Sequence, residues 1–416
     1  MVSGVQSLSG TFLPGLPRRK DRNCFQRKSI QACESTSVSE SRKGRVGLHQ
    51  PEVLSLKSLT YSDLEDWCQS IDEKPRRAQQ LWKWMYHEGR FLENLHDTKG
   101  KQDGFSGAFI DKVQNLATVE GGLRLIDVHQ SLDGTQKLVF EVGNDGSRVE
   151  TVLIPVSRGN RERITVCVSS QIGCAMNCQF CYTGTMGLKT NLSTAQIVEQ
   201  VVVARRLIAQ QRGDTTGSPS PITNVVFMGM GEPFNNLSAV LPACEILTDP
   251  RGLQFSPAKV TVSTVGLVPQ IREFMTESSC ELAVSLHAPT DEIRNFIVPV
   301  NRRHSLSSLI SVLEEFFPRN GPRSVCLEYV MLKGVNDSLQ NAQELLDLTE
   351  RLECTYNLIE FNPYKGALFS PSTQETINEF RKVLVEENRV APIRCSRGQD
   401  EMAACGQLGN AGGSSV

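Results

Sequence analysis

The stretch Ile164-Thr-Val-Cys167-Val-Ser-Ser-Gln-Ile-Gly-Cys174-Ala-Met-Asn-Cys178-Gln-Phe-Cys181 joins a β-branched run to a loop that carries three cysteines. The run predicts a strand over 164–168, so the cysteines follow the carboxyl end of that strand. Thiolates at spacings of four and three residues can each reach a different iron of one four-iron cluster. The fourth iron is then left without a protein ligand.

An iron without a protein ligand can chelate the amino and carboxylate groups of S-adenosylmethionine (SAM), and electron transfer into the sulfonium then generates a radical. The alternatives are a zinc site and three unrelated thiols. Zinc usually takes four protein ligands in paired short spacings, and no convincing fourth ligand stands nearby. With Phe180 before the third cysteine, the spacing resembles the radical SAM signature. That superfamily implies a partial (βα)6 barrel.

Strands and helices alternate from this loop toward the C-terminus. β-rich runs at 222–228, 259–263, 281–286, 325–331 and 357–361 predict strands, and amphipathic segments at about 193–211, 237–247, 267–275, 306–317, 338–352 and 373–387 predict helices. Repeated βα units imply a parallel sheet with helices on its outer surface. Counting from Ile164 gives about six units, which favours an α/β fold with a partial barrel over a closed eight-unit one. A doubly wound open sheet is the alternative, and the barrel core is assigned to 161–395.

Two smaller regions precede this core. Residues 119–160 predict a β-rich extension with a hairpin turn at Gly143-Asn-Asp-Gly146, and residues 53–118 predict a small helical RNA-binding accessory domain. We expect Ser62 and Glu65 to form a capping box there. Trp84 lies off the apolar stripe, beside basic residues, and is a candidate for stacking on a base or for a domain interface.

The first 50 residues differ in composition from the rest. Residues 1–33 carry six arginines and lysines against Asp21, with several serines and no sustained apolar run. This is typical of a transit peptide, and a disordered basic tail is the alternative. We expect a chloroplast location, with a mitochondrion or the cytoplasm as alternatives.

Composition restricts the class of protein further. There is no apolar run of about 18 residues, so no membrane partner is expected. The net charge is -2, so any nucleic acid must be held by a local patch. Thirteen scattered cysteines do not suit the disulfide framework of a small secreted domain and favour a reducing compartment.

Polar and glycine residues stand at the predicted strand ends. Gly231 and Glu232 end one strand, where glycine lets backbone approach a ligand and a carboxylate can accept the ammonium of methionine. Further candidates for a cofactor shell at the barrel mouth follow other strands, namely Ser263, Ser285, Leu286, His287 and Asn362. Individually each could be a loop cap.

Three other residues carry no clear signal by themselves. Cys167 lies in the strand before the cysteine loop, and Cys405 lies in a small-residue loop, 396–416, near the C-terminus; an arbitrary cysteine is usually buried or idle. Glu150 is one carboxylate on a strand, which is usually solvated.

Across roughly Leu56 to Gly409 the chain resembles the RlmN family of dual-specificity adenine-C2 methyltransferases of ribosomal and transfer RNA. The matching runs begin at Arg148, Cys167, Asn224, Ser285, Glu328, Asn362 and Ala403. Met402 departs from the family, in which an acidic residue often precedes Ala-Ala-Cys.

The resemblance implies a mechanism that consumes two SAM molecules. One methylates Cys405, and a second yields the radical that abstracts hydrogen from the S-methyl group, whose carbon then adds to carbon 2 of adenine. The resemblance makes Glu150 the base that takes the ring proton, and makes Cys167 the thiol that releases the product through a transient disulfide.

The resemblance also implies a 4Fe-4S cluster held by Cys174, Cys178 and Cys181, structured RNA as substrate, and an electron donor such as ferredoxin or flavodoxin. We expect a monomer. The alternatives are a carbon-8 adenine methyltransferase and a non-catalytic iron-sulfur protein that binds RNA as an assembly factor. Retention of both Cys167 and Cys405 favours catalysis.

Overall fold

One ten-stranded sheet organises the chain in this computed structural model, which describes residues 53–87, 89–158, 161–213 and 220–409. Its strand order is β14-β13-β12-β11-β10-β9-β6-β5-β4-β3. The bounds are β3 Leu123–Gln130, β4 Gln136–Val142, β5 Ser147–Arg158, β6 Arg161–Cys167, β9 Ile222–Phe227, β10 Val260–Thr264, β11 Glu281–Ser285, β12 Val325–Met331, β13 Cys354–Glu360 and β14 Ile393–Arg394. The expected leader of residues 1–50 lies outside the described residues.

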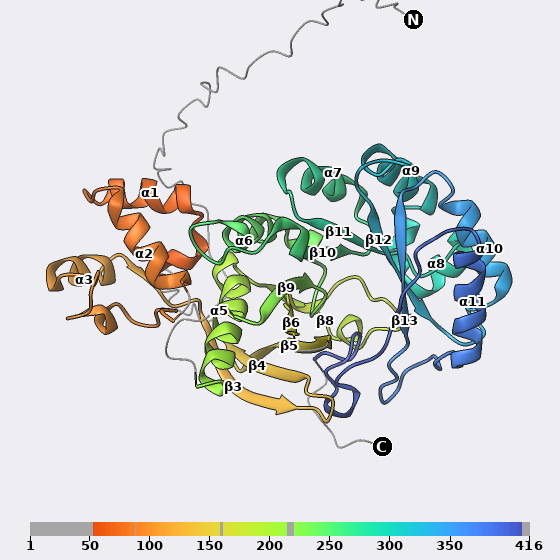
Figure 1. The fold of residues 1–416 in the computed structure, drawn as a ribbon, viewed down its shortest axis with the longest axis horizontal. Helices are drawn as coiled ribbons and strands as arrows, with labels where there is room; N and C mark the ends of the chain where they lie inside the picture. Colours follow the sequence, from red (N-terminus) through yellow and green to blue (C-terminus); the bar gives the residue numbers. More distant parts are fainter. Residues whose placement is uncertain (1–52, 88, 159–160, 214–219, 410–416) are drawn as a thin grey trace, which may run out of the picture. The chain divides into compact units, whose positions relative to one another are not determined.

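The strands from β6 through β9 to β14 are parallel, and each pairs with the next in chain order. A doubly wound sheet would reverse its strand order partway, and this one does not. The connecting helices are α5 Thr194–Gln211, α6 Leu237–Thr248, α7 Val268–Glu277, α9 Leu306–Phe316, α10 Leu339–Leu348 and α11 Gln374–Glu386. The six predicted βα units are confirmed, and Figure 1 shows their helices around the outside of the curved sheet. Within the barrel region, the prediction missed two short helices, α4 Tyr182–Thr185 and α8 Asp291–Ile297.

Local sequence accounts for the elements. The capping box predicted for α5 is present, with Ser193 accepting from the backbone of Gln196 and the Gln196 side chain accepting in return. The apolar stripe of α5 is buried, as its spacing requires. Strand β12 has the predicted bounds because its β-branched and aromatic residues are buried on both faces of the sheet.

Strands β3, β4 and β5 extend the same sheet in antiparallel fashion beyond β6. The predicted hairpin is confirmed, because β4 ends at Val142 and β5 begins at Ser147. The β-rich region is therefore continuous with the barrel sheet. A separate two-stranded sheet, β7 Gln171–Cys174 with β8 Gly187–Asn191, flanks the cysteine loop.

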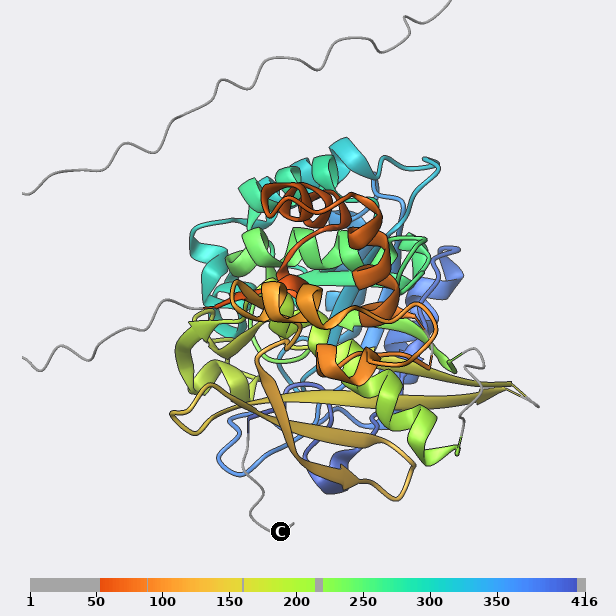
Figure 2. The same ribbon diagram turned by 90° about the vertical axis from the view of Figure 1, so that its left-hand side faces the viewer.

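The N-terminal helical region packs against α5, as Figure 2 shows. Its helices are α1 Tyr61–Ser70, α2 Arg76–Tyr86 and α3 Gly107–Gln114. The buried ammonium of Lys57 pairs with the carboxylate of Glu199 on α5. A buried charge without its partner is costly, so this pair fixes how the region sits on α5. The predicted capping box is wrong: Thr60 and Asp63 form it, because both spacings fit the motif and the helix begins earlier.

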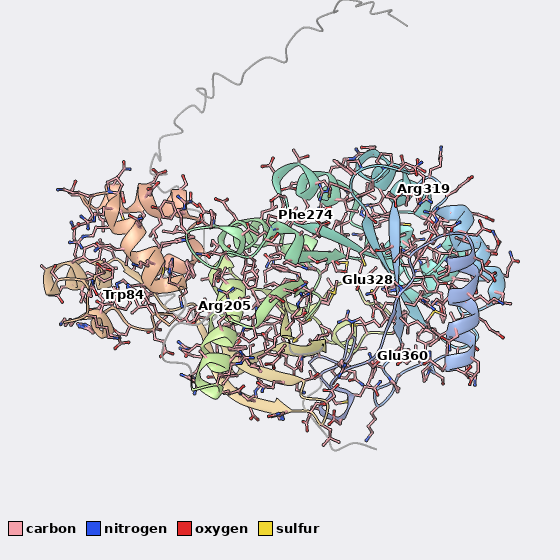
Figure 3. All side chains as sticks on the ribbon, in the orientation of Figure 1. Trp84, Arg205, Phe274, Arg319, Glu328 and Glu360 are labelled. Carbon is pink, nitrogen blue, oxygen red and sulfur yellow. The ribbon has the colours of Figure 1, made fainter. Side chains whose placement is uncertain are left out.

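The side chain of Trp84 is almost fully enclosed by its own region of the chain. Its side chain is buried, its indole N–H donates to the carbonyl of Asp103 at 2.8 Å, and the guanidinium of Arg90 lies 4.4 Å from its ring. Figure 3 shows it inside the N-terminal helical region. The stacking prediction is therefore wrong, because the loop after α2 covers a helix face that spacing alone leaves open.

No helix among the described residues has the length and apolar character needed to cross a membrane.

Candidate active site

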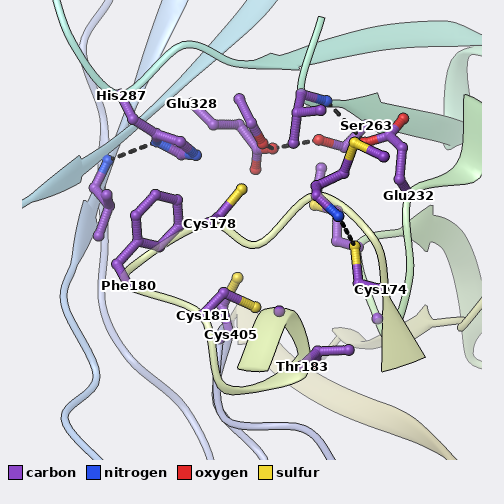
Figure 4. A pocket seen from close by; sticks show the side chains of 18 of the residues that line it. Cys174, Cys178, Phe180, Cys181, Thr183, Glu232, Ser263, His287, Glu328 and Cys405 are labelled. Carbon is purple, nitrogen blue, oxygen red and sulfur yellow. Dashed lines mark hydrogen bonds between the residues drawn. The ribbon is translucent and has the colours of Figure 1, made fainter. Parts of the chain in front are cut away.

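A cavity lies at the carboxyl ends of β9 to β13. Its volume is about 960 Å³, including space open to solvent. All three cysteines of the predicted cluster loop line it, together with most of the predicted cofactor shell: Gly231, Glu232, Ser263, Ser285, His287 and Asn362. Figure 4 shows Cys174, Cys178 and Cys181 around one space, with Ser263 and Glu328 on its other side. The parallel topology explains this, since it brings the carboxyl ends of all these strands to one rim.

The three thiols of the cysteine loop have raised pKa values. Burial raises the pKa of Cys174 to about 12 and raises the pKa values of Cys178 and Cys181 as well. Buried thiols of this kind become good ligands when a metal replaces their protons. Among the described residues, no three His, Cys, Asp or Glu side chains converge closely enough for one metal ion.

Gly231 and Glu232 form a tight turn after β9. Gly231 has a φ of +99°, and a Cβ there would lie 2.5 Å from Cβ of Gln171. Glu232 Oε1 accepts from the N–H of Phe234 at 3.0 Å, and Oε2 accepts from the N–H of Val265 at 2.9 Å. Burial raises the pKa of Glu232 to about 7, against these hydrogen bonds. A carboxylate held in this way can bind an ammonium group.

Glu328 is a site residue that strand-end reasoning missed. Its Oε2 accepts from Ser263 Oγ at 2.5 Å and from Ser285 Oγ at 3.3 Å, so both predicted serines are joined through it. Figure 3 shows it in the middle of the barrel side chains. Glu328 lies in the middle of β12. The predicted cofactor shell consists only of residues at strand ends and therefore does not include it. The available signal was its place in a run that matches the family.

His287 occupies a strained position beside the cavity. Its φ is +61°, its Nδ1 accepts from the N–H of Val330 at 3.1 Å, and its ring lies 4.7 Å from that of Phe180. Burial lowers the pKa of His287 to about 3, so the ring is neutral. Leu286, also predicted for the shell, has a fully buried side chain and does not line the cavity. Its backbone N–H donates to the carbonyl of Glu328 at 3.0 Å.

The loop that carries Cys405 is tied to the cluster loop. Tyr182 N–H donates to the carbonyl of Gly406 at 2.8 Å, and Thr183 Oγ1 donates to the carbonyl of Leu408 at 2.7 Å. Asn362 Nδ2 donates to the carbonyl of Cys405 at 3.0 Å, so this predicted cofactor residue holds the loop. These contacts bring Cys405 into the cavity of the cluster cysteines.

Met402, the departure from the family pattern, lies in the same loop. It has a left-handed φ of +50°, a conformation that Asp and Asn adopt more readily than Met. The thiol of Cys405 still reaches the cavity with Met at this position.

Cys167 lies in a second, smaller cavity that Cys405 also lines. Burial raises the pKa of Cys167 to about 12, with Cys405 adding to the rise and Arg394 opposing it. The Cys405 residue keeps exposed surface, yet its thiol is surrounded by protein and desolvation raises its pKa to about 11, again against Arg394. The cysteines of the described segments are all free thiols, so the structure holds no disulfide there.

Glu150 lies apart from both cavities, in a groove between β3 to β5 and the C-terminal loop. Its Oε2 accepts from the N–H of Gly409 at 2.9 Å, and Lys137 Nζ lies 3.9 Å from Oε1. It is buried and not solvated as its strand position alone suggested, and burial raises its pKa. The structure thus places Glu150 against the loop of Cys405 but not beside its thiol.

A six-unit partial barrel with three cysteines after its first strand and a Gly-Glu turn after the second is the arrangement of a radical SAM enzyme. Residues 168–346 match the model of the radical SAM superfamily, and residues 54–93 match that of the ribosomal RNA large subunit methyltransferase N-terminal domain. The superfamily implies a 4Fe-4S cluster and SAM.

The chain belongs to the RlmN family of RNA methyltransferases. It is 42% identical over 359 residues to the dual-specificity RNA methyltransferase RlmN of Geotalea uraniireducens, covering 86% of this chain and 97% of the relative. It is 36% identical to the RlmN of Gluconobacter oxydans, covering 93% and 92% of the two chains. A radical SAM methyltransferase structure from Sphaerobacter thermophilus superposes with a TM-score of 0.76 at 38% identity, covering 85% of this chain and 98% of that one.

Proposed function

We propose that the protein methylates carbon 2 of an adenosine in ribosomal RNA, transfer RNA or both, through a methyl group carried on Cys405. The observation that carries this is the position of Cys405, which lines both the cluster cavity and the cavity of Cys167. A thiol in this position can receive a methyl group in the cavity of the cluster cysteines. The second thiol can then attack its sulfur and free the methylated product. The names of the relatives support RNA as the substrate.

When bound, the cluster and SAM supply the radical that removes hydrogen from a methyl group. Glu232 would hold the ammonium group of SAM. The hydroxyl groups of Ser263 and Ser285, together with the carboxylate of Glu328, would orient the SAM molecule. Cys405 accepts a methyl group from one SAM, and its S-methyl carbon loses hydrogen as a second SAM is consumed. That carbon then bonds to carbon 2 of adenine, which joins enzyme and RNA covalently and leaves one unpaired electron on the adduct. The adduct passes this electron to a one-electron acceptor before release.

Release uses Cys167 and Glu150. Glu150 takes the proton from ring carbon 2, a general-base role that its raised pKa favours. The Cys167 thiolate forms an S–S bond to Cys405, the S–C bond to the product breaks, and its electron pair goes to the product carbon, which takes a proton. The two sulfurs are oxidised and the product carbon is reduced, so the step balances. A dithiol reductant then restores both thiols.

The remaining assignments are part of the proposal. Ferredoxin or flavodoxin is the one-electron donor, the enzyme acts as a monomer, and the basic leader directs it to the chloroplast. The helical region 53–118 contributes to RNA binding. A carbon-8 methyltransferase would use the same thiols and cluster, so the position of the new methyl group is the decisive property.

The test is methylation by anaerobically reconstituted full-length protein given SAM, reductant and RNA transcripts. We expect 2-methyladenosine by mass spectrometry of digested nucleosides, and about four irons per chain that are lost in Cys178→Ala but retained in Cys395→Ala. Methylation of carbon 8 would show instead that the protein is a carbon-8 methyltransferase. No methyladenosine with any RNA would overturn the function.

A further inference from the structure

Arg394 reaches across the interior of the partial barrel. It lies on β14, the last strand, where it pairs with Ile359 of β13. Its Nη1 lies 3.7 Å from Sδ of Met228, which directly follows β9. Strand β9 is the neighbour of β6, which carries Cys167 opposite Val226. The cationic side chain of Arg394 on the last strand therefore reaches the first strands of the barrel.

Arg394 shares a cavity with the two thiols of the proposed release step. Arg394, Cys167, Cys405 and Met228 line one cavity of about 490 Å³. In the part of the chain that the structure describes, no carboxylate comes within ion-pair distance of Arg394, and its hydrogen bond to Met228 Sδ is a weak one. Its charge is therefore not consumed by a salt bridge.

Cys167 needs a positive charge in this cavity. The residue is 6% exposed, and desolvation disfavours its thiolate. The groups that face it are Cys405 on the C-terminal loop and Glu328 on β12, which disfavour the thiolate, and the backbone N–H of Met228 and Arg394, which favour it. Only a thiolate attacks sulfur at a useful rate.

We propose that Arg394 is a positioning residue for product release, whose guanidinium stabilises the Cys167 thiolate as it attacks the sulfur of Cys405. This inference rests on the proposed function for the step it serves. The guanidinium takes no part in bond making and no proton leaves it. Glu328 faces the same thiols and Arg394, and its negative charge disfavours the Cys167 thiolate.

The first test measures thiol reactivity without RNA. Full-length protein is treated with methyl methanethiosulfonate at pH 6 to 10, and modification of the Cys167 peptide is followed by mass spectrometry. We expect Arg394→Gln to slow the reaction about tenfold at pH 8 and to move its pH profile upward by roughly one unit. Arg394→Lys should restore at least half of the rate, because it keeps the charge.

Two further variants control for structure. Arg397→Gln removes a second arginine that lines the same cavity but pairs with Asp133 at 3.9 Å, and we expect no change in the Cys167 profile. Glu328→Gln removes the opposing charge and should move the profile downward, which tests the electrostatic argument even if Arg394→Gln does not fold. An unchanged profile in Arg394→Gln, or an upward shift in Glu328→Gln, would overturn the proposal.

The second test follows release of RNA. With substrate, Arg394→Gln should accumulate a covalent protein–RNA adduct whose decay speeds up with rising pH, whereas Arg394→Lys should release product at near-normal rates. If wild-type protein makes no methyladenosine, the proposed function fails while the reactivity test still decides the effect of Arg394 on Cys167. If wild-type methylates and both variants release product normally, Arg394 has no part in release.

Discussion

The backbone N–H of Gly409 donates to Oε2 of Glu150 at 2.9 Å, across 259 positions of the chain. This bond joins the loop of Cys405 to β5, a strand of the antiparallel half of the sheet. It gives the C-terminal loop a further anchor, besides its bonds to the cluster loop and to Asn362. The hydrogen bonding of the Glu150 carboxylate therefore depends on whether this loop is docked.

Glu150→Gln should separate the early and late steps of the reaction. The amide oxygen can still accept from Gly409, but it cannot take the proton from ring carbon 2. We expect methylated Cys405 by peptide mass spectrometry and a loss of methyladenosine of at least about a hundredfold, the scale of a lost general base. Glu141→Gln, at an exposed ion pair with Arg124, is the control. Normal product from Glu150→Gln would remove Glu150 from the mechanism.

Cys167→Ala should trap RNA on the enzyme. Without the attacking thiol, the bond between Cys405 and the product carbon persists, so labelled RNA should migrate with the protein on a denaturing gel. Cys395→Ala removes an exposed thiol that lines the same cavity and should leave no adduct. Free product at normal rates from Cys167→Ala would contradict its role.

Gly231→Ala should damage the turn that holds Glu232. Both this substitution and the control, Gly143→Ala, place a side chain at positive φ, which costs about 1–2 kcal/mol. Only at Gly231 would the new Cβ also clash, with Gln171, whereas nothing lies within 4 Å at Gly143. We expect SAM affinity to fall at least tenfold for Gly231→Ala alone, measured by equilibrium dialysis. Equal affinities in the two variants would argue against this turn as the binding site.

His287→Asn should make the protein less sensitive to acid. The pKa of His287 is about 3 in the fold, against 6.5 for an unperturbed histidine, so between these values the unfolded chain binds a proton that the folded chain does not. Stability conferred by the neutral ring is complete above pH 6.5 and is lost at roughly 1.4 kcal/mol per pH unit below it. Asn does not titrate and tolerates the positive φ.

The comparison is the melting temperature of wild type and His287→Asn from pH 7 to pH 5. We expect the wild type to lose stability relative to the variant as the pH falls. His96→Asn, at an exposed ring that contacts Gln114, should follow the wild type. Parallel curves for His287→Asn and wild type would mean that the ring takes up a proton as readily in the folded chain as in the unfolded chain.

Local sequence was enough for the main strands and helices of the barrel and for a cysteine triad whose members line one cavity. Strand β12 and the capping box of α5 follow from side-chain shape and from hydrogen bonds between near neighbours, and the cysteine triad is a spacing within eight residues. The errors have a local cause too. Two capping motifs overlap at the start of α1, and periodicity does not reveal that the loop reaching Asp103 covers Trp84.

The sequence by itself determined the alternation of strands and helices, the three thiols and the glycine turn, because each depends on residues close together in the chain. Only the tertiary structure decided that Cys405 meets both the cluster cysteines and Cys167, that Glu328 joins two serines, and that Arg394 reaches the first strands. Those contacts require the sheet to curve and the C-terminal loop to bond across it. Curvature and loop docking are properties of the whole packed chain, so no local pattern encodes them.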